Sequence, residues 1–123
     1  MAILLVEDNP INQKLARHVL ERAGHQVTMV GNGRQALQAS ADTVFDVVLM
    51  DLQMPEMGGL DATEKIREAE EMSGGHIPII ALTAAAFDTD RERCLSAGMD
   101  GYLTKPIRMG NLKSTLRDWL PIR

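Results

Sequence analysis

The fold is decided by the stretch Asp46-Val47-Val48-Leu49-Met50-Asp51. Its apolar residues are consecutive and do not alternate with polar ones, which is typical of a strand buried on both faces of a parallel sheet. We expect this strand to span Asp46–Met50. Four further short runs, β-branched or rich in leucine, predict the remaining strands: Ile3–Val6, Gln26–Val30, Ile77–Leu82 and Gly101–Leu103.

Segments with helical periodicity separate these runs. They predict helices over Pro10–Ala23, Arg34–Ala41, Leu60–Glu71, Asp88–Ala97 and Arg108–Leu120. Asn9 is a candidate N-cap, and Ala62, Ile66 and Ala69 form the expected inward face of the third helix. Strict alternation of strands and helices predicts right-handed crossovers and an α/β fold with helices on both faces of the sheet.

The composition is that of one globular domain. The chain has 123 residues, 45% of them hydrophobic, 24% charged and 3% aromatic, so the core must be aliphatic. Thirteen basic against seventeen acidic residues argue against a nucleic-acid-binding surface. A single cysteine, Cys94, cannot form an internal disulfide, which fits a reducing cytosol. No apolar run approaches the length of a membrane span, and the N-terminus lacks the pattern of a signal peptide.

Polar residues follow four of the predicted strands. They are Glu7-Asp8 after the first, Asp51 after the third, Thr83 after the fourth and Lys105-Pro106 after the fifth. In an open α/β sheet, functional groups lie at the carboxyl ends of the strands. Each residue also has an ordinary structural explanation. Glu7 and Asp8 could favour a helix N-terminus, Thr83 could bond backbone, and Lys105 could be a surface lysine.

Three carboxylates meeting at this edge repel one another unless a cation lies between them. An all-oxygen ligand set suits Mg²⁺, which keeps several waters and takes few protein carboxylates. Asp51 is then a candidate nucleophile, because carboxylates form acyl phosphates. Lys105 would neutralise charge on the transferred group. Glu7, Asp8 and Asp51 therefore predict a site for phosphoryl transfer.

The same residues resemble those of a response-regulator receiver domain, the phosphoacceptor module of two-component signalling. The matching stretches are Ile3–Asn9, Val48–Gly59, Ile79–Ala84 and Gly98–Pro106. The resemblance covers essentially the whole chain and implies a flavodoxin-like, CheY-like sheet of strand order 2-1-3-4-5 with five helices. It also implies one domain over residues 1–123, with no room for an output domain.

The resemblance implies a role for each matching residue. Asp51 would take the phosphoryl group from a phosphohistidine. Glu7 and Asp8 would hold Mg²⁺ or Mn²⁺ together with Asp51 and the backbone carbonyl of Gln53. Of the acidic pair, Asp8 would be the direct ligand.

Thr83, Lys105 and Tyr102 would form the catalytic and switch set. Thr83 would move to bond the phosphoryl group, and Tyr102 would turn inward with it, although a half-buried tyrosine in water fits the sequence equally well. The resemblance also implies a cis peptide between Lys105 and Pro106. Gly58-Gly59 replaces the Asp-Gly of many members, which predicts a more flexible loop after the third strand.

The motifs are most similar to receiver domains of hybrid sensor histidine kinases, which imply a histidine kinase or a histidine phosphotransfer domain as partner. Ile11, Leu15 and Pro106 are the candidate docking contacts for its helical bundle. The expected state is a cytoplasmic monomer, or a dimer that forms on phosphorylation, without direct contact to nucleic acid or membrane. As an isolated domain it would not be an enzyme beyond its own phosphorylation and dephosphorylation, whereas a hybrid parent would be a protein-histidine kinase.

Other classes remain open at this point. A stand-alone single-domain regulator that acts by docking would have the same sequence features. A haloacid-dehalogenase-like phosphatase also uses a carboxylate and Mg²⁺, but needs Asp-x-Asp after its first strand. A binding module that works without phosphorylation would have lost Asp51, Thr83 or Lys105. A flavodoxin-like nucleotide-binding protein needs a Gly- or Ser/Thr-rich first loop, where this chain has acids.

Four residues with no predicted role complete the picture. His18, His25 and His76 lack metal-ligand spacing and are expected to be solvated at the surface. Cys94 is expected to be a small buried or half-buried apolar residue.

Overall fold

The computed structural model describes residues 2–52, 58–83 and 88–104. The strands are β1 (Ala2–Val6), β2 (Gln26–Val30), β3 (Val47–Asp51), β4 (Ile79–Thr83) and β5 (Gly101–Thr104). The helices are α1 (Pro10–Arg22), α2 (Gly33–Asp42), α3 (Gly59–Ser73) and α4 (Asp88–Ala97). Each of these elements was predicted, with boundaries that agree to within two residues. The predicted helix Arg108–Leu120 lies outside the described residues.

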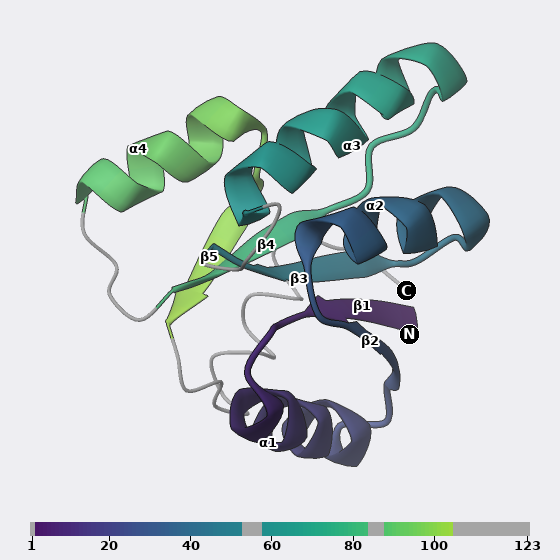
Figure 1. The fold of residues 1–123 in the computed structure, drawn as a ribbon, viewed down its shortest axis with the longest axis vertical. Coiled ribbons are helices and arrows are strands. Elements are labelled where there is room, and N and C mark those ends of the chain that lie inside the picture. Colours follow the sequence, from purple (N-terminus) through teal and green to yellow (C-terminus); the bar gives the residue numbers. More distant parts are fainter. Residues whose placement is uncertain (1, 53–57, 84–87, 105–123) are drawn as a thin grey trace.

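The five strands form one parallel sheet in the order β2-β1-β3-β4-β5. α1 covers one face of the sheet, and α2, α3 and α4 lie on the other (Figure 1). Strand order reverses between β1 and β3, and the carboxyl ends of these two strands are therefore where a ligand is expected. The fold class implied by the sequence is confirmed.

Alternate residues of the central strands build two separate cores. Ile3 and Leu5 pack with Ala16 and Leu20 of α1 in one core. On the opposite face, the second core contains the following residues: Leu4, Val6, Ala36, Val48, Met50, Ala62, Ile66 and Cys94. Both faces of β1 and β3 are consequently buried, which explains why their sequences are continuously apolar.

The helix starts follow from local chemistry. Asn9 is the N-cap of α1, as predicted: its Oδ1 accepts the backbone N–H groups of Ile11 and Asn12 at 2.9 and 3.1 Å. Asn32 caps α2 in the same way by accepting the N–H of Gln35 at 2.8 Å. Among the described helices, none has both the length and the apolar character needed to cross a bilayer.

One prediction about α3 is wrong. Ala69 was assigned to the inward face with Ala62 and Ile66, but it is exposed and lines a groove between the C-terminal halves of α2 and α3. These halves separate toward the helix ends (Figure 1), so the last turns of α3 do not pack on the sheet. α3 begins at Gly59, one residue earlier than predicted, and Gly59 is buried. The loop that was predicted to be more flexible lies mostly outside the described residues.

Arg67 fastens the middle of α3 to the segments that enter β4 and β5. Its guanidinium donates to the carbonyls of Gly98 at 2.9 Å and Ile77 at 2.8 Å, and it pairs with Glu70 and Asp100 at 2.6 and 2.8 Å. The side chains of Arg67 and Asp100 are each 15% exposed. This partly buried network fixes α3 relative to the two strands.

Candidate functional site

Three carboxylates converge at the carboxyl ends of β1 and β3. Glu7, Asp8 and Asp51 each offer one oxygen, and these oxygens lie within 4.8 Å of one another. Glu7 and Asp51 are 2% and 4% exposed, whereas Asp8 is exposed. Two of the acids are buried and the third is exposed to solvent. Such a group can bind a hard cation and leave some of the cation's coordination positions open to a ligand.

The register of the sheet causes this convergence. Val6 of β1 lies opposite Met50 of β3, so the next residues, Glu7 and Asp51, are neighbours across the same edge. Four apolar residues precede Asp51 in its strand, which carries the carboxylate to the edge of a buried sheet. Burying two acids side by side is costly unless a cation compensates them. The arrangement therefore favours metal binding over simple helix capping.

The turn from β1 into α1 is held by several hydrogen bonds. The N–H of Glu7 donates to the carbonyl of Val30 at 3.1 Å, and the Glu7 carboxylate accepts the N–H of Asn9 at 3.3 Å. Gln13, one turn into α1, donates from its side-chain amide to the Glu7 carbonyl. The first turn of α1 and the acidic pair therefore form one connected unit.

Gly59 brings the start of α3 against Asp51. A β-carbon on Gly59 would meet the backbone carbonyl of Asp51 and would lie 3.0 Å from the Cα of Leu52. The N–H of Gly59 donates to the Leu52 carbonyl at 3.3 Å, and its own carbonyl accepts the hydroxyl of Thr63 at 2.8 Å. Sequence reasoning missed this role, and the signal for it was the position of the glycine eight residues after Asp51.

Thr83 and Tyr102 lie on the next two strands of the sheet, Thr83 at the carboxyl end of β4 and Tyr102 within β5. Leu82 lies opposite Asp51, so Thr83, the last residue of β4, is one residue beyond that pair and is partly buried. Tyr102 on β5 lies opposite Ala81 and is 36% exposed. The structure thus brings Thr83 to the site edge and leaves Tyr102 near the surface. Gln53, Lys105 and Pro106 lie outside the described residues.

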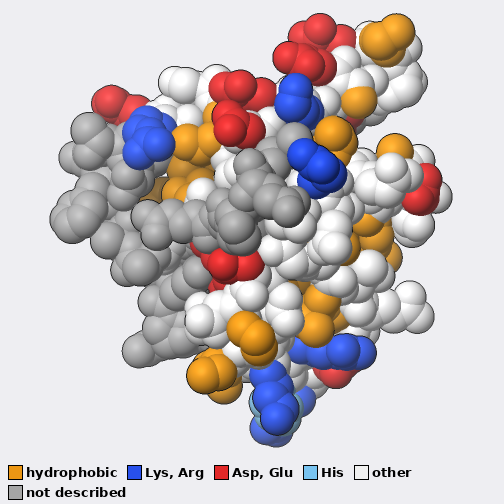
Figure 2. Space-filling model, viewed as in Figure 1, with side chains coloured by type: hydrophobic (Ala, Val, Ile, Leu, Met, Phe, Trp, Pro, Cys, Tyr) orange, Lys and Arg blue, Asp and Glu red, His pale blue; other side chains and the backbone are white. Residues whose placement is uncertain are grey.

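The start of α1 has exposed apolar side chains. Ile11 is 70% exposed and Leu15 is 56% exposed. Figure 2 shows hydrophobic side chains on the α1 end of the molecule beside basic ones, and Lys14 and Arg17 of α1 are exposed. Both predicted docking contacts in the described part are therefore exposed to solvent.

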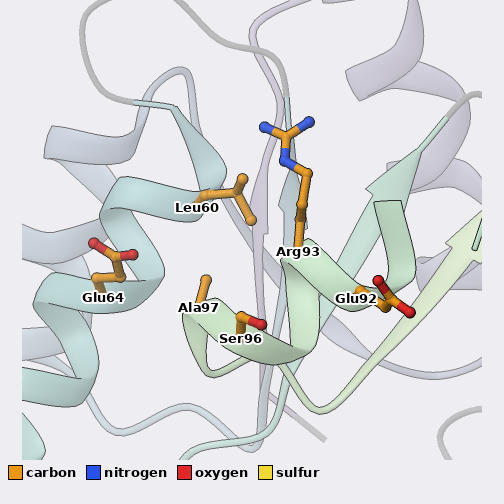
Figure 3. Close-up of a pocket in the computed structure, with 6 residues that line it drawn as sticks. All are labelled: Leu60, Glu64, Glu92, Arg93, Ser96 and Ala97. Atoms are coloured by element: carbon orange, nitrogen blue, oxygen red, sulfur yellow. The ribbon is translucent and has the colours of Figure 1, made fainter. Parts of the chain in front are cut away.

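A groove of about 440 Å³ separates α3 from α4, but its side chains do not converge. It is lined by Leu60, Glu64, Glu92, Arg93, Ser96 and Ala97. Figure 3 shows Glu64 and Glu92 on opposite sides of this groove. These six residues do not form a set of ligands or a catalytic group, and the acidic edge remains the candidate site.

His18 and His76 are exposed, as predicted, whereas His25 is partly buried. Nδ1 of His25 is buried and has no hydrogen-bond partner among the described residues, and burial lowers the pKa of this imidazole below its usual value. His76 is 59% exposed, yet its Nε2 lies 2.7 Å from a carboxylate oxygen of Asp100. Cys94 is buried in the core, as predicted.

The response regulator receiver domain family matches residues 3–117 of the chain. The match includes all three converging acids and the strands that carry them. The chain belongs to this family. Receiver domains of hybrid sensor histidine kinases are among those most similar to this one.

Two solved structures illustrate the similarity. One is the receiver domain of sensor histidine kinase PA1611 from Pseudomonas aeruginosa, which is 44% identical to this chain. The two structures superpose with a TM-score of 0.86 over 96% of this chain and 95% of the other. The PA1611 domain has a magnesium ion coordinated in its active site cleft. The receiver domain of Ssk1 from Saccharomyces cerevisiae, solved with the histidine phosphotransfer protein Ypd1, is 30% identical with a TM-score of 0.91, over 97% and 88% of the two chains.

The curated relatives differ in length. This receiver domain spans 15%, 6% and 13% of the first three histidine kinases that it matches. It also matches the polar-differentiation response regulator DivK of Brucella anthropi, at 36% identity over 97% of this chain and 95% of that protein. Receivers of this type thus occur both within long kinases and as stand-alone regulators.

Proposed function

We propose that this receiver domain accepts a phosphoryl group on Asp51 from a phosphohistidine and works in a phosphorelay. The single observation that carries the proposal is the convergence of Glu7, Asp8 and Asp51 within 4.8 Å at the switch in strand order. Membership of the receiver family supports it, since an aspartyl phosphate needs a carboxylate beside a cation site. On this proposal residues 1–123 make up one receiver domain.

In the transfer, a carboxylate oxygen of Asp51 forms a bond to phosphorus while the bond from phosphorus to the histidine nitrogen breaks. The electron pair of the broken bond stays on the imidazole, which leaves neutral with its proton on the other nitrogen. Asp51 is fixed at the end of a buried strand, so the attacking oxygen is oriented before the donor arrives.

Glu7, Asp8, Asp51 and the carbonyl of Gln53 are the proposed ligands of Mg²⁺ or Mn²⁺. The two buried acids and the exposed Asp8 fit a hard cation that retains waters. When bound, the ion neutralises charge on the transferred phosphoryl group. We propose that Lys105, which follows the fifth strand, also neutralises charge on the phosphoryl group. We further propose that the peptide between Lys105 and Pro106 is in the cis form.

Thr83 and Tyr102 are the proposed switch. Thr83 lies next along the edge from Asp51 and can donate a hydroxyl hydrogen bond to a phosphoryl oxygen. Tyr102 lies one strand further away at the surface, where a change of rotamer would alter the exposed face.

The proposed partner is the helical bundle of a histidine kinase or a histidine phosphotransfer domain. Ile11 and Leu15 supply exposed apolar contacts beside the site, and Pro106 is proposed as a third. The solved pair of Ssk1 with Ypd1 supports a partner of this kind. We favour a cytoplasmic receiver that belongs to a hybrid sensor histidine kinase and passes the group onward. A stand-alone regulator, as in DivK, is the second candidate.

The test is phosphorylation by a small donor. The protein is incubated with MgCl₂ and acetyl phosphate, and its intact mass is measured; we expect one phosphoryl adduct that disappears in Asp51→Asn. Glu64→Gln, on the exposed face of α3, is the matched control and should be phosphorylated normally. An adduct that persists in Asp51→Asn would overturn the assignment.

A second measurement separates the two candidates. The phosphorylated protein is mixed with a histidine phosphotransfer protein such as Ypd1. Rapid appearance of phosphohistidine on that protein supports the onward relay. Retention of the group on Asp51 with altered binding to a partner supports the stand-alone regulator.

A further inference from the structure

Glu7 directly follows the last residue of β1, so its carbonyl lies beyond the paired part of the sheet. The ladders of β1 with β2 and β3 end at the pairs Val6 with Val30 and Val6 with Met50. The N–H of Glu7 still reaches the Val30 carbonyl at 3.1 Å. Its C=O instead accepts a hydrogen bond from the side-chain amide of Gln13.

The orientation of the Glu7 carbonyl determines the position of the Asp8 backbone. The C=O of Glu7 and the N and Cα of Asp8 share one planar peptide unit. A hydrogen bond that holds this oxygen therefore fixes the orientation of the plane and the starting point of the Asp8 side chain. Asp8 needs such support because its side chain is exposed, in contrast to the buried Glu7 and Asp51.

Gln13 is itself well anchored. Its backbone N–H donates to the Asn9 carbonyl at 2.9 Å, which places it in the first hydrogen-bonded turn of α1. Asn9 caps that turn, so the amide donor is presented from a rigid element.

We propose that Gln13 is a positioning residue for the metal site: it holds the Glu7–Asp8 peptide so that Asp8 joins Glu7 and Asp51 around the cation. This inference rests on the proposed function. On this inference α1 has a second role besides docking: it orders Asp8, the exposed metal ligand, before the metal binds.

The experiment compares Gln13→Met with Gln35→Met. Gln35 is the matched control, because it stands in the first turn of α2 and its Oε1 accepts the N–H of Gly31 at 2.7 Å, after an outer strand without acids. Mg²⁺ affinity is measured by calorimetry. The Mg²⁺ concentration that gives half-maximal phosphorylation by acetyl phosphate is measured beside the rate at saturating Mg²⁺.

For Gln13→Met we expect Mg²⁺ affinity to fall about three- to tenfold, the amount that one lost hydrogen bond produces. The half-saturating Mg²⁺ concentration should rise by the same factor, while the rate at saturating Mg²⁺ is retained. Gln35→Met should change neither. A merely structural role would lower the melting temperature without Mg²⁺ in both variants and leave their affinities equal.

Unchanged Mg²⁺ affinity in Gln13→Met, with normal binding by the wild type, would overturn the role of Gln13 alone. Absence of Mg²⁺ binding by the wild type would overturn the proposed function instead.

Discussion

A β-carbon on Gly59 would collide with the backbone carbonyl oxygen of Asp51. The first residue of α3 therefore packs directly against the residue that we propose as phosphoacceptor. Neither atom is the end of a flexible side chain, so the contact cannot be relieved by a rotamer change. The spacing between the sheet edge and α3 depends on the absence of one methyl group.

Replacing Gly59 by serine should destabilise the protein by about 1–3 kcal/mol, the usual cost of overpacking. The added atoms must push α3 or the Asp51 backbone away, so phosphorylation by acetyl phosphate should also slow. Urea denaturation and intact mass after timed incubation measure the two effects.

Gly58→Ser is the matched control. A β-carbon there has the Leu52 carbonyl as its nearest neighbour at 3.6 Å, an ordinary contact. Because Gly58 is the N-cap of α3 and serine is favoured at that position, stability should change by less than about 0.5 kcal/mol. Equal losses in the two serine variants would contradict a specific contact between Gly59 and Asp51.

Asp51→Asn should stabilise the protein in the absence of divalent cations. Removing one of three carboxylates that lie within 4.8 Å relieves repulsion, and we expect a gain of about 1 kcal/mol, or about 4 °C in Tm. Mg²⁺ at 10 mM should raise the Tm of the wild type by mass action and that of the variant much less. Thermal melts with EDTA and with MgCl₂ measure both effects. A wild-type Tm indifferent to Mg²⁺ would count against the metal site.

The burial of His25 predicts a pH dependence of stability. Its pKa is lowered in the folded protein from the ordinary 6.5, so below that pH the unfolded chain binds more protons than the folded one. The contribution of neutral His25 is fully present above pH 6.5 and is lost as the pH falls through the folded pKa. The free energy of unfolding should therefore decrease as the pH falls below about 6.5.

Urea titrations across this range, in the wild type and in His25→Gln, isolate the effect. The slope should flatten in the variant, because glutamine does not titrate. His18→Gln, at an exposed position on α1, is the control and should keep the wild-type slope. An unchanged slope in His25→Gln would assign the pH dependence to other groups.

Arg67→Met should destabilise the protein by about 3 kcal/mol, because it leaves the Gly98 and Ile77 carbonyls and the Asp100 carboxylate short of a donor in a partly buried site. Chemical denaturation measures the loss. In Arg17→Met the lost ion pair with Glu21 is about half exposed, and the change should stay below about 0.5 kcal/mol. A comparable small effect for Arg67→Met would show that the network does not hold α3 in place.

Much of this fold could be predicted because its signals are local. The consecutive apolar residues of 47–50 indicate burial on both faces, and Asn9 with Pro10 marks the start of α1. The alternation of strands and helices then limits the topology to a parallel sheet and brings the strand ends together. The convergence of Glu7 and Asp51 followed from that rule, and the structure confirms it.

What could not be predicted depends on contacts between distant segments. The exposure of Ala69 depends on how far α3 extends beyond the sheet, and helical periodicity carries no information on that distance. His25 differs from the other histidines because the fold buries its Nδ1, and nothing in its sequence neighbourhood indicates that burial. Nothing in the sequence near Arg67 distinguishes it from other helix residues. Its partners Gly98 and Asp100 are more than thirty positions away in the chain and are brought beside it only by the fold.

The sequence by itself determined the order of the elements, the parallel sheet and the acids at its edge, because hydrophobic periodicity, capping residues and strand-end chemistry are properties of short segments. Only the tertiary structure decided which acids are buried, how closely their oxygens approach and which neighbours hold them. Glu7 and Asp8 are adjacent in the chain, yet one is enclosed and the other exposed. Packing density and hydrogen-bond geometry between separate elements set that difference, and they exist only after the chain has folded.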